Sequence, residues 1–396
     1  MVNTLVFLRE MLKREVREGN RDHLIHLVPD PRGERRSIVE EITSGIMRHR
    51  EKEPSLLAKE VRQFWKGVEL MSSFSHSNPN LPSRHVWGNA VLCDVAARLS
   101  LDHTKVLNIA HDFRTPGHHA EQGHQIRYFQ GKIPVLERPD VPYAFQESLL
   151  QIERVRTGEC SDYNARLESL VAIHNSNCNG TLPRTSAERI VACRNVFLRE
   201  VLGMEIIPET ITSSLRENIA GTLELLDEKG KPFYNLDLPR SRETWLAPGT
   251  KNICWVKYVD TEATSSEKGL PAKVHIPLFE RDGFFTSECG KYRIPTREIY
   301  QKLRTGNLVP MVQTLVLATV VAPQIPHIGG GSFKNYAPDL VRDLAEQLQL
   351  PFEGLVHTTK GIDPCVYRSG NKGLLSSIYV HYPLLGKEFV RELIGL

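Results

Sequence analysis

The sequence lacks the marks of several large classes of protein. The apolar stretch at its start is interrupted at Arg9 and Glu10, too early for a signal peptide or a membrane span. The seven cysteines are scattered and contain no CxxC pair, which argues against a disulfide framework and a zinc ribbon. A net charge of only +3 gives the chain as a whole no attraction to nucleic acid. We therefore expect a cytoplasmic protein with neither membrane nor nucleic acid among its partners.

Familiar catalytic signatures are missing as well. The sequence contains no GxSxG elbow, P-loop, GxGxxG fingerprint or zincin spacing, no internal repeat and no low-complexity tract. Its 40% hydrophobic and 24% charged residues are those of an ordinary globular protein, and its 396 residues suggest two or three domains. A site must therefore be sought in the placement of polar residues.

The first part of the chain alternates between helical and strand-like patterns. Apolar residues recur at helical spacing from Leu5 to Val16, at Ile38, Ile42 and Ile46, and over Leu56–Met71. Ser72–Pro82, rich in Ser, Asn and Pro, is expected to be a loop, and Gly88–Ser100 a helix. Two short apolar runs are typical of buried parallel strands, Lys105–Ala110 and Leu167–Ile173, and the Gly- and His-rich segment Thr115–Pro142 between them predicts a long loop.

The second part adds an antiparallel piece and a glycine loop. Capping patterns at Thr185, Ser214 and Thr296 predict helix starts, the first two for helices reaching Leu202 and Leu226. Three strand-like runs indicate a small antiparallel insertion: Asn252–Tyr258, Lys273–Phe279 and Phe284–Thr286. After the β-branched run Thr314–Val321, Gln324–Asp339 predicts a strand, a glycine loop and the start of a helix.

These patterns favour an α/β fold with a Rossmann-like parallel sheet core, a helical N-terminal segment and a β-rich insertion. The expected divisions are the helical segment over residues 1–71, the first part of the core over 72–184, a connective insertion over 185–293, and the second part of the core with a C-terminal segment over 294–396. Ligands of such sheets lie outside the carboxyl ends of the strands, so polar residues there are the candidate site residues.

The glycine loop is the first candidate. A glycine run between a strand and a helix lets backbone N–H groups approach an anion, and the helix dipole assists. The alternative is a tight turn that needs positive φ angles. Residues expected to bind substrate or an anion here are Gly329, Gly330, Gly331, Ser332, Lys334, Asn335 and Tyr336.

A histidine-rich stretch is the second candidate. It contains His111, Asp112, His118, His119, Glu121 and His124. Because histidine titrates near neutral pH, we favour acid–base catalysis or substrate binding, with His111, Asp112, His118 and His119 as catalytic residues. A polar loop that satisfies its own backbone is the alternative. A metal site is the least favoured, since the spacing fits no metal motif, and we expect no metal.

Two further polar clusters follow predicted strands or loops. His76, Asn78, Asn80, Arg84 and Asn89 either form turns and helix caps or line the site as binding residues. The other, His174–Asn179, contains Cys178, which would be a nucleophile only if a neighbouring histidine lowered its pKa.

The stretch Ile294–Pro351 resembles the bacillithiol cysteine ligases (BshC). The shared features are a helix, Asn307-Leu308-x-Pro310-x-x-Gln313, an apolar run, a Gly-Gly loop followed by Tyr336, and a helix ending at Leu350-Pro351. Phe284–Pro295 and, more weakly, Asn89–Asp112 are also similar to that family. The resemblance implies a nucleotidyltransferase-like core whose cleft binds a nucleotide (ATP or ADP) and forms a C–N bond. It would place Gly329, Gly330, Asn335 and Tyr336 in that cleft with His76, Asn78, Asn89, His111 and Asp112.

Departures from the family favour a changed reaction. Ser75-His76-Ser77-Asn78 stands where the family has Gly-Gln-Gln, Val309 where it has arginine, and Lys334-Asn335 where it has an acidic residue. The leading hypothesis is a C–N bond-forming enzyme of natural-product metabolism, in which an amine displaces an anionic leaving group, as in closure of an aziridine with loss of sulfate. The alternatives are a cysteine-adding ligase of bacillithiol type and a non-catalytic partner that retains the fold.

Partners follow from these hypotheses. We expect a small-molecule amine substrate, and a protein partner subunit is a further expectation. If the substrate is tethered to an acidic carrier protein, the basic stretches Arg32–Arg36 and Arg48–Lys52 are the predicted docking site. The simpler interpretation of these stretches is a solvated helix face.

Overall fold

The protein is described by a computed structural model. It describes residues 34–76, 83–111, 126–128, 131–133, 197–237, 254–260, 274–330, 336–359 and 386–394, together with Lys13, Val191, Arg194, Asn195 and Phe333.

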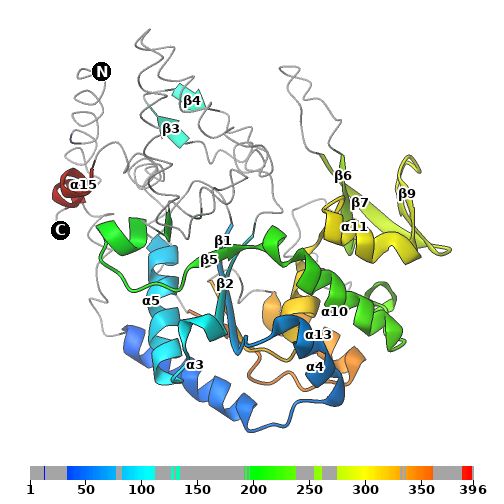
Figure 1. Cartoon of the computed structure of the whole chain (residues 1–396), viewed down its shortest axis with the longest axis horizontal. Helices are drawn as coiled ribbons and strands as arrows, with labels where there is room; N and C mark the ends of the chain where they lie inside the picture. The colour runs from blue at the N-terminus through cyan, green and yellow to red at the C-terminus, as the bar shows by residue number, and fades with distance from the viewer. Residues whose placement is uncertain are drawn as a thin grey trace.

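A five-stranded parallel sheet forms the centre of the molecule (Figure 1). Its strands are β1 (Leu70–His76), β2 (Val106–His111), β5 (Glu209–Ile211), β11 (His327–Gly329) and β12 (Val356–Thr358). They lie in the order β12-β11-β1-β2-β5, and every neighbouring pair is parallel. The chain therefore builds outward from β1 to one side with β2 and β5, and later to the other side with β11 and β12.

Helices cover both faces of this sheet. Alternation along β1 sends Leu70 and Phe74 to one face and Met71 to the other, because successive side chains of a strand point in opposite directions. The first face packs against α3 (Glu34–Arg50) and α5 (Ser83–Arg98). The second packs against α10 (Arg216–Glu228), α13 (Ala337–Leu348) and the π-helix η8 (Leu317–Val321).

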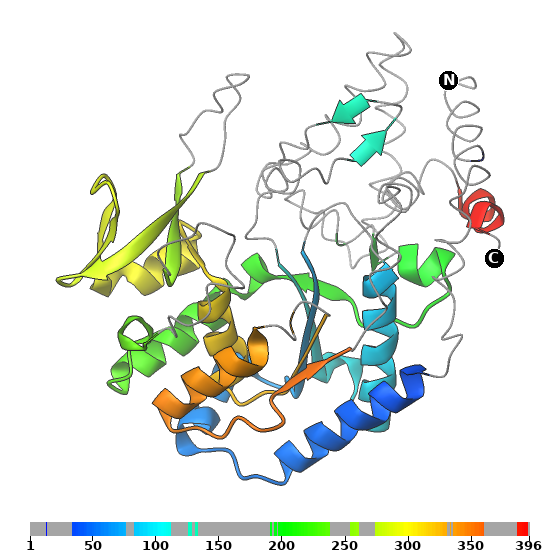
Figure 2. The same ribbon diagram turned by 180° about the vertical axis from the view of Figure 1, so that it is seen from behind.

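A second sheet is antiparallel and shares the core of the first (Figure 2). Its order is β10 (Leu308–Pro310), β6 (Val256–Asp260), β7 (Val274–Arg281), β8 (Phe284–Ser287) and β9 (Arg293–Pro295). Val256, Leu278 and Phe285 on its inner face belong to the same buried cluster as Met71 of β1 and Leu344 of α13. The two sheets are thus joined by one continuous hydrophobic core.

Shorter elements connect these parts. They are α4 (Leu56–Val61), η2 (Arg62–Trp65), η3 (His103–Lys105), the hairpin β3 (Ile126–Tyr128) and β4 (Gly131–Ile133), the π-helix η4 (Phe197–Val201), η5 (Thr212–Leu215), η6 (Phe233–Asn235), η7 (Thr296–Glu298), α11 (Ile299–Thr305), α12 (Val312–Val316) and α15 (Lys387–Ile394).

The mixed α/β class with a parallel sheet is confirmed, as are the strand over Lys105–Ala110 and the antiparallel runs. The expected helix over Leu56–Met71 is wrong beyond Trp65, because Gly67 adopts a φ of +79° and β1 begins at Leu70. The expected loop from Ser72 is also wrong. Ser72 to His76 are strand residues of β1, and the Ser72 side chain is satisfied by a buried partner on β2.

Several local features depart from what their composition indicates. The β-branched run Thr314–Val321, for which no element was predicted, is helical, since it forms most of α12 and all of η8. Neither Ser214 nor Thr296 caps a helix with its side chain, because short 3-10 turns precede α10 and α11. The strand β5 lies within the range expected to be insertion, yet it pairs with β2. The run Leu167–Ile173 lies outside the described residues, as do several residues of the helix expected to reach Leu202, whose described part includes the π-helix η4.

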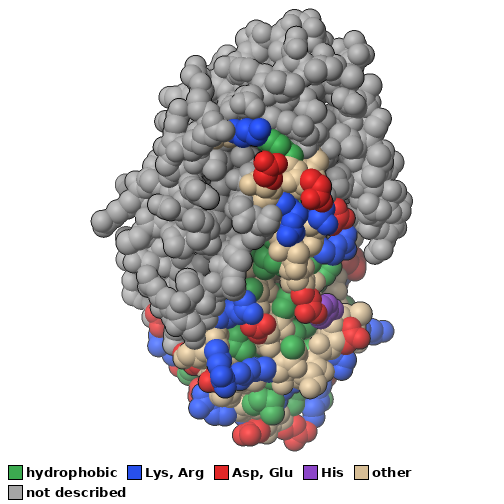
Figure 3. All heavy atoms as spheres, turned by 90° about the vertical axis from the view of Figure 1, so that its left-hand side faces the viewer, with side chains coloured by type: hydrophobic (Ala, Val, Ile, Leu, Met, Phe, Trp, Pro, Cys, Tyr) green, Lys and Arg blue, Asp and Glu red, His purple; other side chains and the backbone are tan. Residues whose placement is uncertain are grey.

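The described surface mixes charges of both signs. Basic and acidic side chains are interspersed over the face shown in Figure 3. Four ion pairs within the molecule involve the basic stretches named above: Arg35–Asp94, Arg36–Glu40, Arg50–Glu69 and Lys52–Glu353. Among the helices described, none has the length and apolar character needed to cross a bilayer.

Candidate active site at the carboxyl ends of the parallel strands

The carboxyl ends of β1, β2, β5 and β11 bring several polar residues to one edge of the sheet. In a parallel sheet these ends share one edge, and ligands bind beside the strand at which the order reverses. Here that strand is β1, which lies between β2 and β11. The backbone of His76 is the register partner of His111, and that of Ser73 is the register partner of Gly329.

His111, the last residue of β2, is held by a threonine from the neighbouring strand. Its Nδ1 lies 3.2 Å from Thr212 Oγ1, and the Thr212 hydroxyl donates to the carbonyl of Ala110 at 3.1 Å. A hydroxyl has only one hydrogen, so Thr212 must accept from the Nδ1–H of His111. This arrangement assigns the lone pair of the neutral ring to Nε2, the nitrogen that can accept a proton.

A second histidine lies within the sheet, two residues before the carboxyl end of β11. His327, the first residue of β11, is 3% exposed, and its Nε2 lies 2.8 Å from Ser73 Oγ on β1. Burial, followed by the neighbouring His111 and His357, lowers the pKa of His327 to about 3, so its ring is neutral at physiological pH. Its Nδ1 is buried without a hydrogen-bond partner.

An aromatic side chain explains the first glycine of the loop. The Phe333 ring lies against the His327 ring, with centroids 5.0 Å apart, and meets the Tyr336 ring edge-on. A Cβ at Gly329 would lie only 2.1 Å from Phe333. Neither Gly329 nor Gly330 has a positive φ, so the tight-turn explanation does not hold for these two residues. Gly329 instead makes room for the ring that covers the buried histidine.

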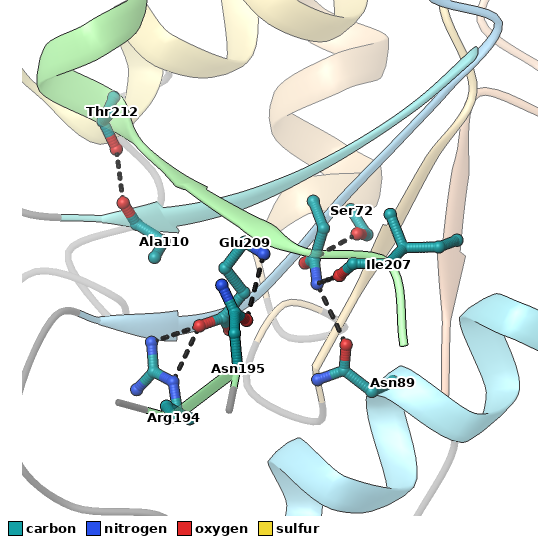
Figure 4. A network of polar contacts seen from close by, with 9 residues as sticks. Ser72, Asn89, Ala110, Arg194, Asn195, Ile207, Glu209 and Thr212 are labelled. Carbon is teal, nitrogen blue, oxygen red and sulfur yellow. Dashed lines mark hydrogen bonds and ion pairs between the residues drawn. The ribbon is translucent and has the colours of Figure 1, made fainter. Parts of the chain in front are cut away.

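On the other face of the sheet a network of amides joins β1, β2 and α5. Asn108 of β2 accepts from Ser72 and donates to Asn89 Oδ1 and to the carbonyl of Ile207, each at 3.0 Å. Ser72, Asn89 and Asn108 are all buried. Figure 4 shows Ser72, Ile207 and Asn89 converging from three elements. Asn89, expected to bind substrate, is therefore part of a buried structural network.

A buried ion pair lies beside this network (Figure 4). Arg194 Nε donates to Glu209 Oε2 at 2.7 Å, and both side chains are almost fully buried. Asn195 accepts from the backbone N–H of Glu209 at 3.2 Å. The pair ties the segment before η4 to the first residue of β5, and it positions the strand from which Thr212 follows.

The structure brings together some of the predicted site residues. Gly329 is the last residue of β11, Gly330 follows it, and Tyr336 directly precedes α13. The backbone of His76 lies at the end of β1, and that of Arg84 lies in the first turn of α5. The remaining candidates lie outside the described residues: Asn78, Asn80, Asp112, His118, His119, Gly331, Ser332, Lys334, Asn335 and Cys178.

Sequence reasoning missed Ser73, Thr212, His327 and Phe333. His327 could have been noticed, since it lies two residues before the first glycine of the run, between apolar neighbours. No sequence pattern marks Thr212 as a partner of His111, because their contact depends on the pairing of β2 with β5.

The described residues offer little support for a metal site or for a nucleophile at either of the two buried cysteines, Cys93 and Cys254. No group of three or more His, Cys, Asp or Glu side chains among them could hold a metal ion. Burial raises the pKa of the Cys93 thiol to about 12 and that of Cys254 to about 11, so both are poor nucleophiles at neutral pH.

Comparisons with protein-family profiles, with curated proteins and with solved structures give no match for this chain.

Proposed function

We propose that this chain is a C–N bond-forming enzyme of small-molecule, natural-product metabolism with a Rossmann-type core. Numbered along the chain, the parallel strands lie in the order 5-4-1-2-3, which is the doubly wound order 3-2-1-4-5 taken from the opposite edge. This order, and the resemblance of Ile294–Pro351 to the bacillithiol cysteine ligases, support the assignment of the core.

The observation that carries the proposal is the oriented imidazole of His111. Thr212 accepts a hydrogen bond from its Nδ1–H. The ring lies at the carboxyl end of β2, next to β1, the strand at which the strand order reverses. A general base needs a nitrogen that carries a lone pair and is held in a defined orientation, and the Thr212 contact gives the lone pair of the neutral His111 ring to Nε2. Thr212 provides the orienting contact from the residue that follows the neighbouring strand β5.

The reaction begins with an amine that is protonated in solution. His111 Nε2 takes one proton from the ammonium group, which frees the nitrogen lone pair. The nitrogen attacks the carbon that bears the leaving group, so a C–N bond forms as the C–O bond breaks and the electron pair leaves with the anion. If both groups are on adjacent carbons of one molecule and the anion is sulfate, the product is an aziridinium ion. The backbone N–H groups of Gly329–Ser332, expected from the sequence to approach an anion, would bind the departing group.

The test uses 2-aminoethyl hydrogen sulfate, the simplest molecule with an amine beside a sulfate ester. We expect the purified protein to release sulfate faster than buffer does. His111→Gln should lower that rate by about a hundredfold or more, the usual contribution of a general base.

His103→Gln is the matched control. His103 lies in η3 at the opposite end of β2 and is 42% exposed, so its loss should leave the rate unchanged. Sulfate release at the buffer rate, or an equal rate in the His111 variant, would contradict the proposed function.

A further inference from the structure

Ser73 is partly exposed to solvent, although it lies in the central strand β1, where side chains are expected to be buried. β1 has neighbours on both sides, and Leu70, Met71 and Ser72 are 0% exposed. Ser73 is nevertheless only half-buried, and its side chain lies on the face that carries His327 rather than on the face of the amide network. A polar group therefore meets solvent at the strand where the order of the sheet reverses.

The direction of the Ser73 hydrogen is set by the buried histidine. The neutral ring of His327 carries one hydrogen, and Nε2 and Ser73 Oγ are 2.8 Å apart. A buried N–H without an acceptor is rarer in proteins than an acceptor without a donor. Because Nδ1 has no partner, the hydrogen belongs on Nε2, which donates to Ser73. The Ser73 hydroxyl then keeps its own hydrogen for another acceptor.

We propose that Ser73 is a substrate-binding residue that donates a hydrogen bond to an uncharged oxygen of the substrate, a carbonyl or hydroxyl group, and that His327 is the positioning residue that turns the Ser73 hydroxyl toward it. This inference rests on the proposed function for the amine and its leaving group, and adds a third recognised group. An uncharged acceptor fits this pair, because neither Ser73 nor the neutral His327 ring supplies a positive charge to balance an anion.

Phe333 protects this arrangement. Its ring lies on the imidazole, at 5.0 Å between centroids and 30° between planes, and is itself 5% exposed. Covering the ring keeps water from the unpartnered Nδ1 and from competing for the His327–Ser73 bond. The pair is thus held before any ligand arrives, which lowers the entropy lost on binding.

The experiment compares two probes that differ in one group. Serine amide O-sulfate carries the amine, the sulfate ester and a carbonyl, whereas 2-aminoethyl hydrogen sulfate lacks the carbonyl. We expect kcat/KM to favour the carbonyl-bearing probe by about tenfold, the effect of one hydrogen bond. Ser73→Ala should abolish that preference, while Ser72→Ala, its neighbour on the opposite face, should keep it.

Two substitutions of His327 separate positioning from general disruption. A glutamine amide reaches the place of Nε2 and can still donate to Ser73, whereas an asparagine amide reaches only the place of Nδ1. His327→Gln should therefore keep most of the preference, and His327→Asn should lose it as Ser73→Ala does. The imidazole ¹⁵N shifts of the wild-type protein should show the hydrogen on Nε2.

The outcomes also separate this inference from the proposed function. Calorimetry measures binding of serine amide O-sulfate. If that binding depends on Ser73 but no sulfate is released, the proposed function is wrong and the inference stands. Sulfate release with equal kcat/KM for both probes, or equal behaviour of the two His327 variants, would overturn the inference alone. Absence of binding of either probe to the wild-type protein would overturn both.

Discussion

Gly329 and Gly330 differ in how much space their surroundings leave for a side chain. A Cβ at Gly329 would lie 2.1 Å from the Phe333 ring, whereas a Cβ at Gly330 would have its nearest neighbour at 3.9 Å, an ordinary contact. Gly329→Ala should therefore displace Phe333 and destabilise the fold by about 1–3 kcal/mol, the usual cost of overpacking. Gly330→Ala should change the free energy of unfolding by about 0.5 kcal/mol or less.

Urea unfolding of the two variants checks this prediction. Equal stability of the Gly329 and Gly330 variants would show that Phe333 does not occupy the place described. Near-ultraviolet circular dichroism should report the displaced ring in the Gly329 variant only.

Thr212 sets the tautomer of His111, so its hydroxyl should matter more than its shape. Thr212→Val keeps the shape but cannot accept from Nδ1–H, and should mix the tautomers and lower kcat for sulfate release by about three- to tenfold. Thr212→Ser should retain both contacts. Imidazole ¹⁵N spectra report the tautomer directly, and an unchanged spectrum in the valine variant would rule out this role.

At the scale of elements, one side chain joins two strands, a helix and a loop. Asn108 bonds Ser72 on β1, Asn89 on α5 and the carbonyl of Ile207 before β5. Asn108→Ala removes three hydrogen bonds from the buried interior and should destabilise the protein by roughly 3 kcal/mol or more. The exposed Asn235 gives a matched control, since its replacement by alanine should alter stability by less than about 0.5 kcal/mol. Thermal or urea unfolding measures both.

Helices and strands whose apolar residues recur at one regular spacing could be predicted from the sequence. Those whose polar residues bond partners far away in the chain could not. The apolar run of β2 and the helical spacing at Ile38, Ile42 and Ile46 were sufficient for their elements. Most of β1 was mistaken for a loop because Ser72, Ser73 and Ser75 are typical of turns, whereas in the fold Ser72 bonds Asn108 and Ser73 bonds His327.

The candidate site shows the same division. His111 and the glycine loop were visible because they follow apolar runs, at the ends where parallel sheets bind ligands. Their partners were not, since Thr212 lies 101 positions from His111 and Ser73 lies 254 positions from His327. Strand pairing alone decides such contacts, and no local pattern in the sequence carries it.

At the scale of the whole molecule, buried histidines make stability depend on pH. Burial is the main cause that lowers the pKa of His327 to about 3 and that of His357 to about 4, from an ordinary value of 6.5. The unfolded chain therefore binds these protons more readily than the folded one. The free energy of unfolding is therefore highest above pH 6.5, where both rings are neutral in the folded and the unfolded chain. It decreases as the pH falls toward 4, by up to about 1.4 kcal/mol per pH unit for each histidine.

Urea unfolding at pH 7.5, 6.0 and 5.0 measures this slope. His49 is also buried with a lowered pKa. His357→Gln removes one of these titrating groups, so the slope should become shallower. Paired carboxylates such as Glu40 and Glu353 have pKa values lowered from 4.5, and they contribute only below the tested range. A stability that is flat between pH 7.5 and 5.0 would contradict the burial of these rings.

The central position of β1 has a consequence during protein synthesis. Its neighbour β11 pairs Met71 with His327 and Ser73 with Gly329, so some 250 residues must be made before that side of β1 is covered. At about 5–20 residues per second this takes roughly 10–50 s. During that time the unpaired edge of the nascent strand is open to the wrong partners. Yield of soluble protein should therefore depend on translation speed and on chaperones that shield an unfinished sheet.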